Sequence, residues 1–328
     1  MRLFVTGAAG FIGSNYVRHV LDTTDDEITI YDALTYAGNL ASIRDVLDDR
    51  RTTFVHADIA DPDAVATAMD GHDAVVHFAA ESHVDRSIVD GSAFVRTNCT
   101  GTNVLCDVAR QVGVEKFLHI STDEVYGSVE TGSSREDDGL RPRSPYSAAK
   151  AGSDLIALSY FSTFGLPVVV SRCSNNFGPY QFPEKVIPLF TTNLLDGLKV
   201  PLYGDGLNVR DWIHVYDHNV AAHLILNEGV PGEIYNIGAG NELTNRELTT
   251  LLLELTGRDE SYVEPVADRL GHDRRYSVDC SKVRELGWPG VSRAFAERLA
   301  ETVDWYREHR DWWEPLKARA SFDRTATK

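Results

Sequence analysis

Short apolar runs alternate with helical stretches through the first half of this 328-residue chain. The runs are apolar on both faces, as strands of a parallel sheet must be when helices cover both sides of the sheet. They occupy residues 3–5, 28–31, 54–56, 74–78, 117–120 and 168–170. The stretches between them, such as 93–112, carry apolar residues at helical spacing. Repeated βα units of this kind predict an α/β fold with a doubly wound parallel Rossmann sheet.

The pattern changes near Asn175, where prolines and glycines punctuate a loop-rich region. We expect a smaller α+β substrate-binding domain there. It is interleaved with the first domain, because residues 233–238 have the pattern of one more strand of the large sheet. The predicted boundaries are 1–174 plus about 211–238 for the cofactor-binding domain, about 175–210 and 239–318 for the second domain, and 319–328 for a disordered tail.

Apolar residues at helical spacing predict an amphipathic helix near the end of the chain, namely Phe295, Leu299, Val303 and Tyr306. The tryptophans nearby are interpreted as packing residues rather than ligand contacts; they are Trp305, Trp312 and Trp313.

Composition excludes several classes of protein. The net charge of −17 argues against non-specific binding to nucleic acid, which needs a basic surface. No run of 18 apolar residues is present, so we expect no association with a membrane. The N-terminal apolar stretch is too short for a secretory signal. The four cysteines do not have the spacing of metal ligands, so we expect reduced thiols, a cytoplasmic protein and no metal site.

A glycine motif, Gly7-Ala8-Ala9-Gly10-Phe11-Ile12-Gly13, follows the first predicted strand and opens the first predicted helix. Glycines let the backbone approach a pyrophosphate, and a helix N-terminus offers free N–H groups to its charge. Asp32 ends the second strand, where a carboxylate accepts hydrogen bonds from ribose hydroxyls and repels a 2′-phosphate. These features predict NAD, rather than NADP, as the cofactor.

Further residues at the carboxyl ends of the strands are expected at the same crevice. The predicted cofactor-binding residues are Gly7, Gly10, Phe11, Ile12, Gly13, Asp32, Leu34, Thr35, Tyr36, Gly38, Asp58, Ile59, Phe78, Ala79, Ala80, Ser82, Thr97, Ser121, Tyr146, Lys150, Cys173 and Asn175.

Thr122-Asp123-Glu124 and the Tyr146-x-x-x-Lys150 pair are the candidate catalytic groups. A Tyr and a Lys four residues apart share one face of a helix. A nearby ammonium favours the phenolate, so Tyr146 can act as a base near neutral pH. That pair and a hydroxyl suffice to oxidise a sugar alcohol. The two adjacent carboxyls add proton-transfer groups, which we interpret as the sign of an elimination, such as loss of water.

These residues resemble the extended short-chain dehydrogenase/reductase family, and within it the dTDP-glucose 4,6-dehydratases. The glycine motif and Tyr-x-x-x-Lys mark only the superfamily. More specific are residues 78–87, 121–127, 176–181, 201–206 and 210–214, and the similarity runs nearly end to end. The Asp-Glu pair is usually absent from epimerases of the superfamily. One departure is Gly-Ala-Ala-Gly in place of the commoner Gly-Gly-Ala-Gly, which is tolerated if the alanine has no positive φ.

The resemblance implies deoxysugar biosynthesis: conversion of dTDP-D-glucose to dTDP-4-keto-6-deoxy-D-glucose plus water, with NAD tightly bound and recycled in each turnover. It implies that Tyr146 removes the 4-hydroxyl proton while Lys150 keeps Tyr146 acidic and Thr122 hydrogen-bonds the reacting oxygen. Glu124 would then remove the C5 proton, and Asp123 would protonate the departing 6-hydroxyl. Adjacent carboxyls need separated pKa values for this.

A diphosphate needs cations, which an acidic chain must supply locally. By resemblance, the substrate-binding residues are Ser82, His83, Thr122, Asp123, Glu124, Tyr146, Asn175, Glu184, Lys185, Val186, Pro188, Pro201, Leu202, Tyr203, Arg210, Asn245, Arg269 and His272. The resemblance also implies a homodimer that pairs the helices near 93–112 and 145–164 across a two-fold axis.

Two alternatives stay open at this point. One is a related NAD-dependent enzyme on another sugar nucleotide, either a 4-epimerase or a dehydratase for a UDP-, CDP- or GDP-sugar. The Asp-Glu pair argues against a simple epimerase, since epimerisation needs no elimination. The other is a non-enzymatic NAD-sensing binding protein on the same fold, which fold alone does not exclude. Such a protein can lose the Tyr or the Lys, whereas both are present here.

Overall fold

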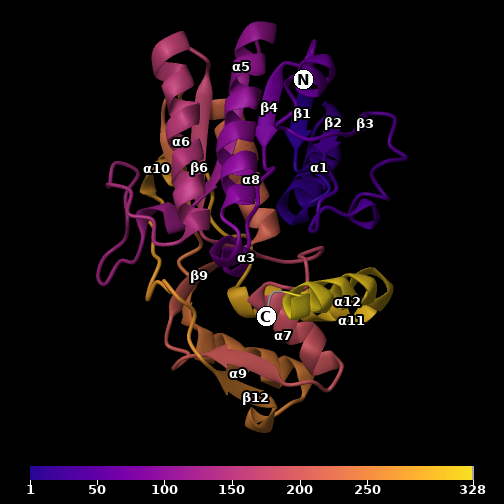
Figure 1. The fold of residues 1–328 in the computed structure, drawn as a ribbon, viewed down its shortest axis with the longest axis vertical. Coiled ribbons are helices and arrows are strands. Elements are labelled where there is room, and N and C mark those ends of the chain that lie inside the picture. The colour runs from indigo at the N-terminus through magenta and orange to yellow at the C-terminus, as the bar shows by residue number, and fades with distance from the viewer. Residues whose placement is uncertain (327–328) are drawn as a thin grey trace.

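A large parallel sheet forms the upper part of the computed structural model, which describes residues 1–326 and side chains as far as Arg319 (Figure 1). Within these residues the sheet has seven strands in the order β10-β6-β5-β4-β1-β2-β3. The strands are β1 (Arg2–Thr6), β2 (Glu27–Asp32), β3 (Thr52–His56), β4 (Ala74–His77), β5 (Lys116–Thr122), β6 (Val168–Cys173) and β10 (Ile234–Ile237). All six strands predicted in the first half are confirmed, and so is the returning strand near 233–238.

Helices cover both faces of this sheet, as the continuously apolar strands require. One face packs in a core with α1 (Phe11–Thr23) and α8 (Val215–Glu228). The other packs with α2 (Pro62–Met69), α5 (Thr102–Val112) and α6 (Pro145–Phe164). The doubly wound architecture is therefore confirmed. The strand order reverses between β1 and β4, which is where such sheets bind their ligands.

The predicted helix over 93–112 is not one regular helix. It is divided into α4 (Ser92–Phe94), a π-helical segment (Val95–Gly101) and α5, and α3 (Val84–Val89) precedes it. Gly101 lies against Ile59, and a Cβ at Gly101 would meet the Ile59 Cδ1 atom at 2.5 Å. A larger residue where the π-helical segment joins α5 would therefore require the Ile59 side chain to move.

A smaller unit lies below the large sheet in Figure 1. Its sheets are β11-β9-β7 and β12-β8, and the helices around them share a third core. The strands are β7 (Asn175–Phe177), β8 (Val200–Tyr203), β9 (Val209–His214), β11 (Glu242–Thr244) and β12 (Val263–Val266), and the helices are α7 (Val186–Leu195), α9 (Asn245–Thr256) and α11 (Phe295–Glu308). Short 3₁₀ turns are Leu40–Ser42, Asp123–Tyr126 and Glu260–Tyr262.

Two placements differ from the predicted boundaries. The β9 strand pairs with β7 and β11 of the smaller unit and not with the large sheet, although Ile213 near its end is buried in the core of the large sheet. A later return to the large sheet is made by α10 (Ser281–Glu285), since Val283 and Trp288 are buried in the core of the large sheet. The sequence of this segment has no run long enough to indicate that return.

The end of the chain is more ordered than predicted. The amphipathic helix is confirmed as α11, with Leu299, Val303 and Tyr306 buried. Trp313 is fully buried, as expected of a packing residue. The tail predicted from about residue 319 is instead part of α12 (Arg310–Ala326), which forms even though it contains Pro315. Residues 327–328 lie outside the described part. Among the described helices, none combines the length and the apolar character needed to cross a membrane.

Candidate active site

A cavity of about 940 Å³ opens where the strands of the large sheet end and the smaller unit begins. It is lined from the carboxyl ends of six strands by Gly7 after β1, Asp32 of β2, Asp58 after β3, Phe78 after β4, Thr122 of β5 and Cys173 of β6. The smaller unit also lines the cavity, among others with residues 201–203 of β8. The volume is at the upper end of the range for small-molecule sites.

The glycine motif brings the backbone close to the neighbouring strand end. Gly7 has a φ of +67°, and a Cβ there would lie 2.5 Å from the backbone nitrogen of Ala79. The N-cap of α1 is Gly10, with no side chain capping the helix, so the first-turn N–H groups are open to an anion. Ala8 and Ala9 have no positive φ, which confirms that the alanines are tolerated.

Asp32 links the glycine motif to the segment after β2. One carboxylate oxygen accepts a hydrogen bond from the backbone N–H of Ala9 at 2.9 Å, and the other accepts one from Leu34 at 2.8 Å. Burial raises the pKa of Asp32, while these two hydrogen bonds oppose the rise. The carboxylate lines the cavity at the place where a ribose would be recognised.

Thr122 ends β5 and caps the 3₁₀ turn that carries the two carboxyls. Its oxygen accepts from the backbone N–H of Glu124, and its hydroxyl donates to Oδ1 of Asp123 at 3.3 Å. Burial, followed by the charge of Glu124, raises the pKa of Asp123 well above its ordinary value. Burial also raises the pKa of Glu124, but the cations Lys185, Arg210 and Arg269 counteract it. The pair therefore lies in a setting that favours one protonated and one ionised carboxyl.

Tyr146 and Lys150 lie in the first two turns of α6, where Ser144 and Ser147 form a capping box and Pro145 begins the helix. The Lys150 Nζ donates to the carbonyl oxygen of Ile120 at 2.7 Å. Burial raises the pKa of Tyr146 well above its ordinary value, and the Glu124 charge adds to this. A hydrogen bond with Thr122 acts in the opposite direction.

Three cations from separate segments line the far side of the cavity. Lys185 donates to the carbonyl oxygen of Ser82 at 2.7 Å, and Arg210 donates to that of Asp273 at 2.9 Å. Arg269 lies 3.7 Å from Asp85. In a chain with a net charge of −17, these three cations are the groups suited to a diphosphate.

The structure brings most of the predicted site residues to this one cavity, and three lie outside its lining. Leu34 has a φ of 50° and packs against the large core, so its N–H rather than its side chain meets Asp32. Tyr36 packs against Phe182. Pro188 is buried within α7. The direction of these three side chains could not be predicted from the pattern of apolar residues in the sequence.

Some lining residues were not predicted. Arg86 lies over the Tyr36 ring at 3.9 Å and pairs with Glu184 at 3.3 Å, and Tyr276 lies under Arg210 at 4.2 Å. A signal for Arg86 exists in the motif at residues 78–87, next to Ser82 and His83. The others are Tyr31, Ala33, Ala37, Ala57, Glu81, Val84, Asp85, Val89, Ala93, Arg96, Ile120, Ser174, Asn176, Gln181, Phe182, Ile187, Leu189, Phe190 and Trp212.

The lining fits a dinucleotide beside a second ligand. Buried polar atoms that face no partner among the described residues include Oγ of Ser121, Oδ2 of Asp123 and Oδ1 of Asn175. All three residues line the cavity. Since buried polar groups are normally hydrogen-bonded, these atoms are suited to a bound ligand. The glycine cradle around Gly7 supplies the pyrophosphate end of the same site.

Fold and site together define a dinucleotide-binding enzyme of the extended short-chain dehydrogenase/reductase class. The model of the family described as GDP-mannose 4,6 dehydratase matches residues 4–302. The chain belongs to this family. A dTDP-glucose 4,6-dehydratase of Streptomyces antibioticus is 59% identical over 97% of this chain and 96% of its own length.

Solved structures show the same similarity. The dTDP-glucose 4,6-dehydratase DesIV of Streptomyces venezuelae, with NAD and TYD bound, has a TM-score of 0.94 and 56% identity, covering 96% of this chain and all of its own. A UDP-glucose 4-epimerase of Thermus thermophilus in complex with NAD has a TM-score of 0.88 and 33% identity, covering 94% of this chain and 100% of its own.

Proposed function

We propose that this chain converts dTDP-D-glucose to dTDP-4-keto-6-deoxy-D-glucose plus water, as a hydro-lyase that holds NAD and recycles it within each turnover. The observation that carries this proposal is the buried Asp123-Glu124 pair directly after Thr122, in the same cavity as Tyr146 and Lys150. The names of the relatives at 53–59% identity support the same reaction.

The first step is oxidation at C4 of the sugar. Tyr146 takes the proton of the 4-hydroxyl, and Thr122 hydrogen-bonds the reacting oxygen. Lys150, buried and donating to Ile120, holds a positive charge near the phenol. NAD, when bound, supplies the acceptor for the C4 hydride and a positive ring that favours the phenolate, and it gives the hydride back at C6. Within the protein, burial and the Glu124 charge raise the pKa of the Tyr146 phenol, and the hydrogen bond with Thr122 lowers it.

The second step is elimination across C5 and C6. The 4-ketone acidifies the C5 proton, which Glu124 removes as a carboxylate. Asp123 is protonated because its pKa is raised, so it can give a proton to the departing 6-hydroxyl, which leaves as water. Return of the hydride to C6 and of a proton to C5 completes the 4-keto-6-deoxy sugar with no net redox change.

The nucleotide half of the substrate binds against the smaller unit. The charges of Lys185, Arg210 and Arg269 all lower the pKa of Glu124, so the three cations lie near one another in the cavity. Together they neutralise the diphosphate. Tyr203 lies at the edge of the lining with His272, their rings 6.5 Å apart, and is our candidate for contact with the base. His272 is fixed by a 2.7 Å hydrogen bond between its Nδ1 and the carboxylate of Asp268.

Two finer assignments follow from the surface and the cysteines. Exposed apolar side chains on the π-helical segment and α6, namely Val95, Leu155 and Phe164, are suited to a homodimer interface. All four cysteines, each in the described part of the chain, are unpaired, which suits a reducing cytoplasm. Mass measured in solution would test the dimer, and Leu155→Glu should shift it toward monomer.

The experiment that tests the reaction is mass spectrometry of dTDP-glucose incubated with the purified protein, without added reductant. Loss of one water from the sugar nucleotide, with no net accumulation of NADH, is the expected result. An unchanged mass, even after NAD is added, would contradict the proposal. The same assay with UDP-, CDP- and GDP-sugars distinguishes another dehydratase, and a product of unchanged mass but altered C4 configuration would indicate an epimerase.

A further inference from the structure

The segment that follows β2, residues 33–43, forms one wall of the cavity. Ala33, Thr35, Ala37 and Gly38 all line it. A molecule bound along the glycine motif and Asp32 is therefore covered on this side by the 33–43 segment. The segment carries only a short 3₁₀ turn, Leu40–Ser42, and depends on contacts from elsewhere for its position.

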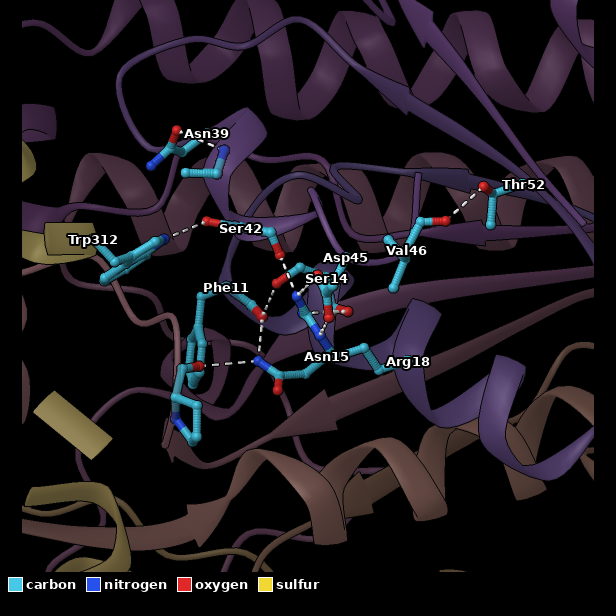
Figure 2. Close-up of polar contacts among 12 residues, drawn as sticks. Phe11, Ser14, Asn15, Arg18, Asn39, Ser42, Asp45, Val46, Thr52 and Trp312 are labelled. Atoms are coloured by element: carbon cyan, nitrogen blue, oxygen red, sulfur yellow. Dashed lines mark hydrogen bonds and ion pairs between the residues drawn. The ribbon is translucent and has the colours of Figure 1, made fainter. Parts of the chain in front are cut away.

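The far end of the 33–43 segment is held by the C-terminal helix. The indole Nε1 of Trp312, on α12, donates to Oγ of Ser42 at 3.2 Å, as Figure 2 shows. Ser42 is buried and Trp312 is half-buried, so this hydrogen bond is partly shielded from water. Trp312 and Leu316 also pack with Phe182 and Tyr36. One helix from the end of the chain thus binds the segment at Ser42 and shares a small apolar cluster with Tyr36.

Arg18 of α1 also binds the 33–43 segment at Ser42. It donates to the carbonyl oxygen of Ser42 at 2.6 Å and to the carboxylate of Asp45 (Figure 2). Its guanidinium lies 4.1 Å from the centre of the Tyr180 ring, and Trp312 meets the same ring edge-on at 5.6 Å. The 33–43 segment, α1 and α12 therefore meet around Tyr180.

The helix α12 is itself fixed to the smaller unit. The indole of Trp313 donates to the carbonyl oxygen of Tyr306 at 2.6 Å, and Arg310 pairs with Asp196 at 2.6 Å. The hydroxyl of Tyr306 in turn donates to the carbonyl oxygen of Gln181, which lines the cavity. Opening the 33–43 segment therefore requires breaking its contacts with α12 or moving α12 away from the smaller unit.

We propose that α12 latches the 33–43 segment over bound NAD, with Trp312 as a positioning residue that controls release of the cofactor. This inference rests on the proposed function, in which the same NAD must stay bound between removal and return of the hydride. Trp312 acts through Ser42 and Tyr36 rather than by touching NAD.

The test is the rate at which purified holoenzyme exchanges its NAD for labelled NAD, without sugar nucleotide. Trp312→Phe keeps an aromatic ring but loses the N–H donor. Because a hydrogen bond contributes about 1 kcal/mol, this variant should release NAD about fivefold faster than wild type. Trp312→Ala also loses the packing, and release should be faster by about tenfold or more. The matched control is Trp288→Phe, a tryptophan buried in the core of the large sheet whose indole N–H has no hydrogen-bond partner among the described residues.

A structural readout accompanies the rates. Hydrogen exchange of residues 33–43 should rise in the Trp312 variants and not in Trp288→Phe. Equal rates of NAD release from wild type and Trp312→Phe would overturn the latch, and so would a Trp288→Phe variant that releases NAD as fast as the Trp312 variants. The comparison with Trp312→Phe decides the question even if Trp312→Ala does not fold. Normal dehydration of dTDP-glucose with an unaffected exchange rate refutes the latch alone, whereas a protein that binds no NAD refutes the proposed function as well.

Discussion

The carboxylate of Asp154 accepts a 2.9 Å hydrogen bond from Nε of Arg172, and both side chains are almost fully buried. Asp154 lies one helical turn after Lys150 on α6, and its other oxygen is 3.3 Å from Nε2 of His119. Burial lowers the pKa of Lys150, and the negative charge of Asp154 is the first group to oppose this. The negative charge of Asp154, next to the active site, therefore stabilises the protonated form of Lys150.

Asp154→Asn should destabilise the protein and weaken catalysis together. The change leaves the Arg172 charge buried without its partner, which costs about 3–5 kcal/mol of the free energy of unfolding. It also removes the charge that keeps Lys150 protonated, so the upper limb of the pH–rate profile should move to lower pH. Urea unfolding and kcat/KM measured against pH check both effects.

The control for that variant is Asp107→Asn. Asp107 pairs with Arg110 on the exposed face of α5, and such pairs contribute about 0–1 kcal/mol. A stability loss in Asp154→Asn no larger than in this control would contradict the role of the buried pair. If Asp154→Asn loses the expected stability but its pH–rate profile does not shift, Asp154 has a structural role and does not act on Lys150.

The sequence was sufficient to predict the elements whose pattern is local. The strands of the large sheet are apolar on both faces, and the glycine motif and Thr122 follow strands directly, so their meeting at one edge could be inferred. The active-site positions Tyr146 and Lys150 follow from helical spacing in the same way.

The sequence could not reveal features that depend on tertiary pairing. Asp154 and Arg172 are charged and would be expected on the surface, but each is buried only because the other is its partner. The return of residues near Val283 to the large sheet has no periodic signal either. Tyr36 was predicted to contact the cofactor, but side chains in loops do not alternate, and its ring packs on Phe182 instead.

Glu124→Gln should abolish dehydration while substrate still reduces part of the bound NAD. The amide cannot remove the C5 proton, whereas Tyr146 and Lys150 are unchanged, so the reaction stops at the 4-ketone. A loss of about 10²–10⁴ in turnover is expected, with NADH absorbance appearing on the enzyme. The control is Glu254→Gln, an exposed position on α9. Wild-type turnover in Glu124→Gln would remove this residue from the role of C5 base.

Asp32→Ala should loosen the preference for NAD over NADP. It removes repulsion of a 2′-phosphate and two charge-assisted hydrogen bonds, from the N–H groups of Ala9 and Leu34, each worth about 1.5–3 kcal/mol. NAD affinity should therefore fall by about tenfold or more, and that of NADP should fall less. Asp32→Asn, which keeps the shape without the charge, separates the two causes. An unchanged ratio of the two dissociation constants would contradict the assignment.

Asp123→Asn should make the protein more stable than wild type, and more so at pH 8 than at pH 5. The pKa of Asp123 is raised in the folded state, so above its ordinary value of 3.8 the folded state binds more protons than the unfolded state. Stability of the wild type is full below that value and falls as the pH rises through the folded pKa. The amide has no proton to lose, so the variant avoids this fall.

The midpoints of urea unfolding at the two pH values measure the difference, with Asp304→Asn on α11 as an exposed control. A gain that is the same at both pH values would show that Asp123 is already ionised at pH 5, and it could not then serve as the acid that protonates the leaving hydroxyl.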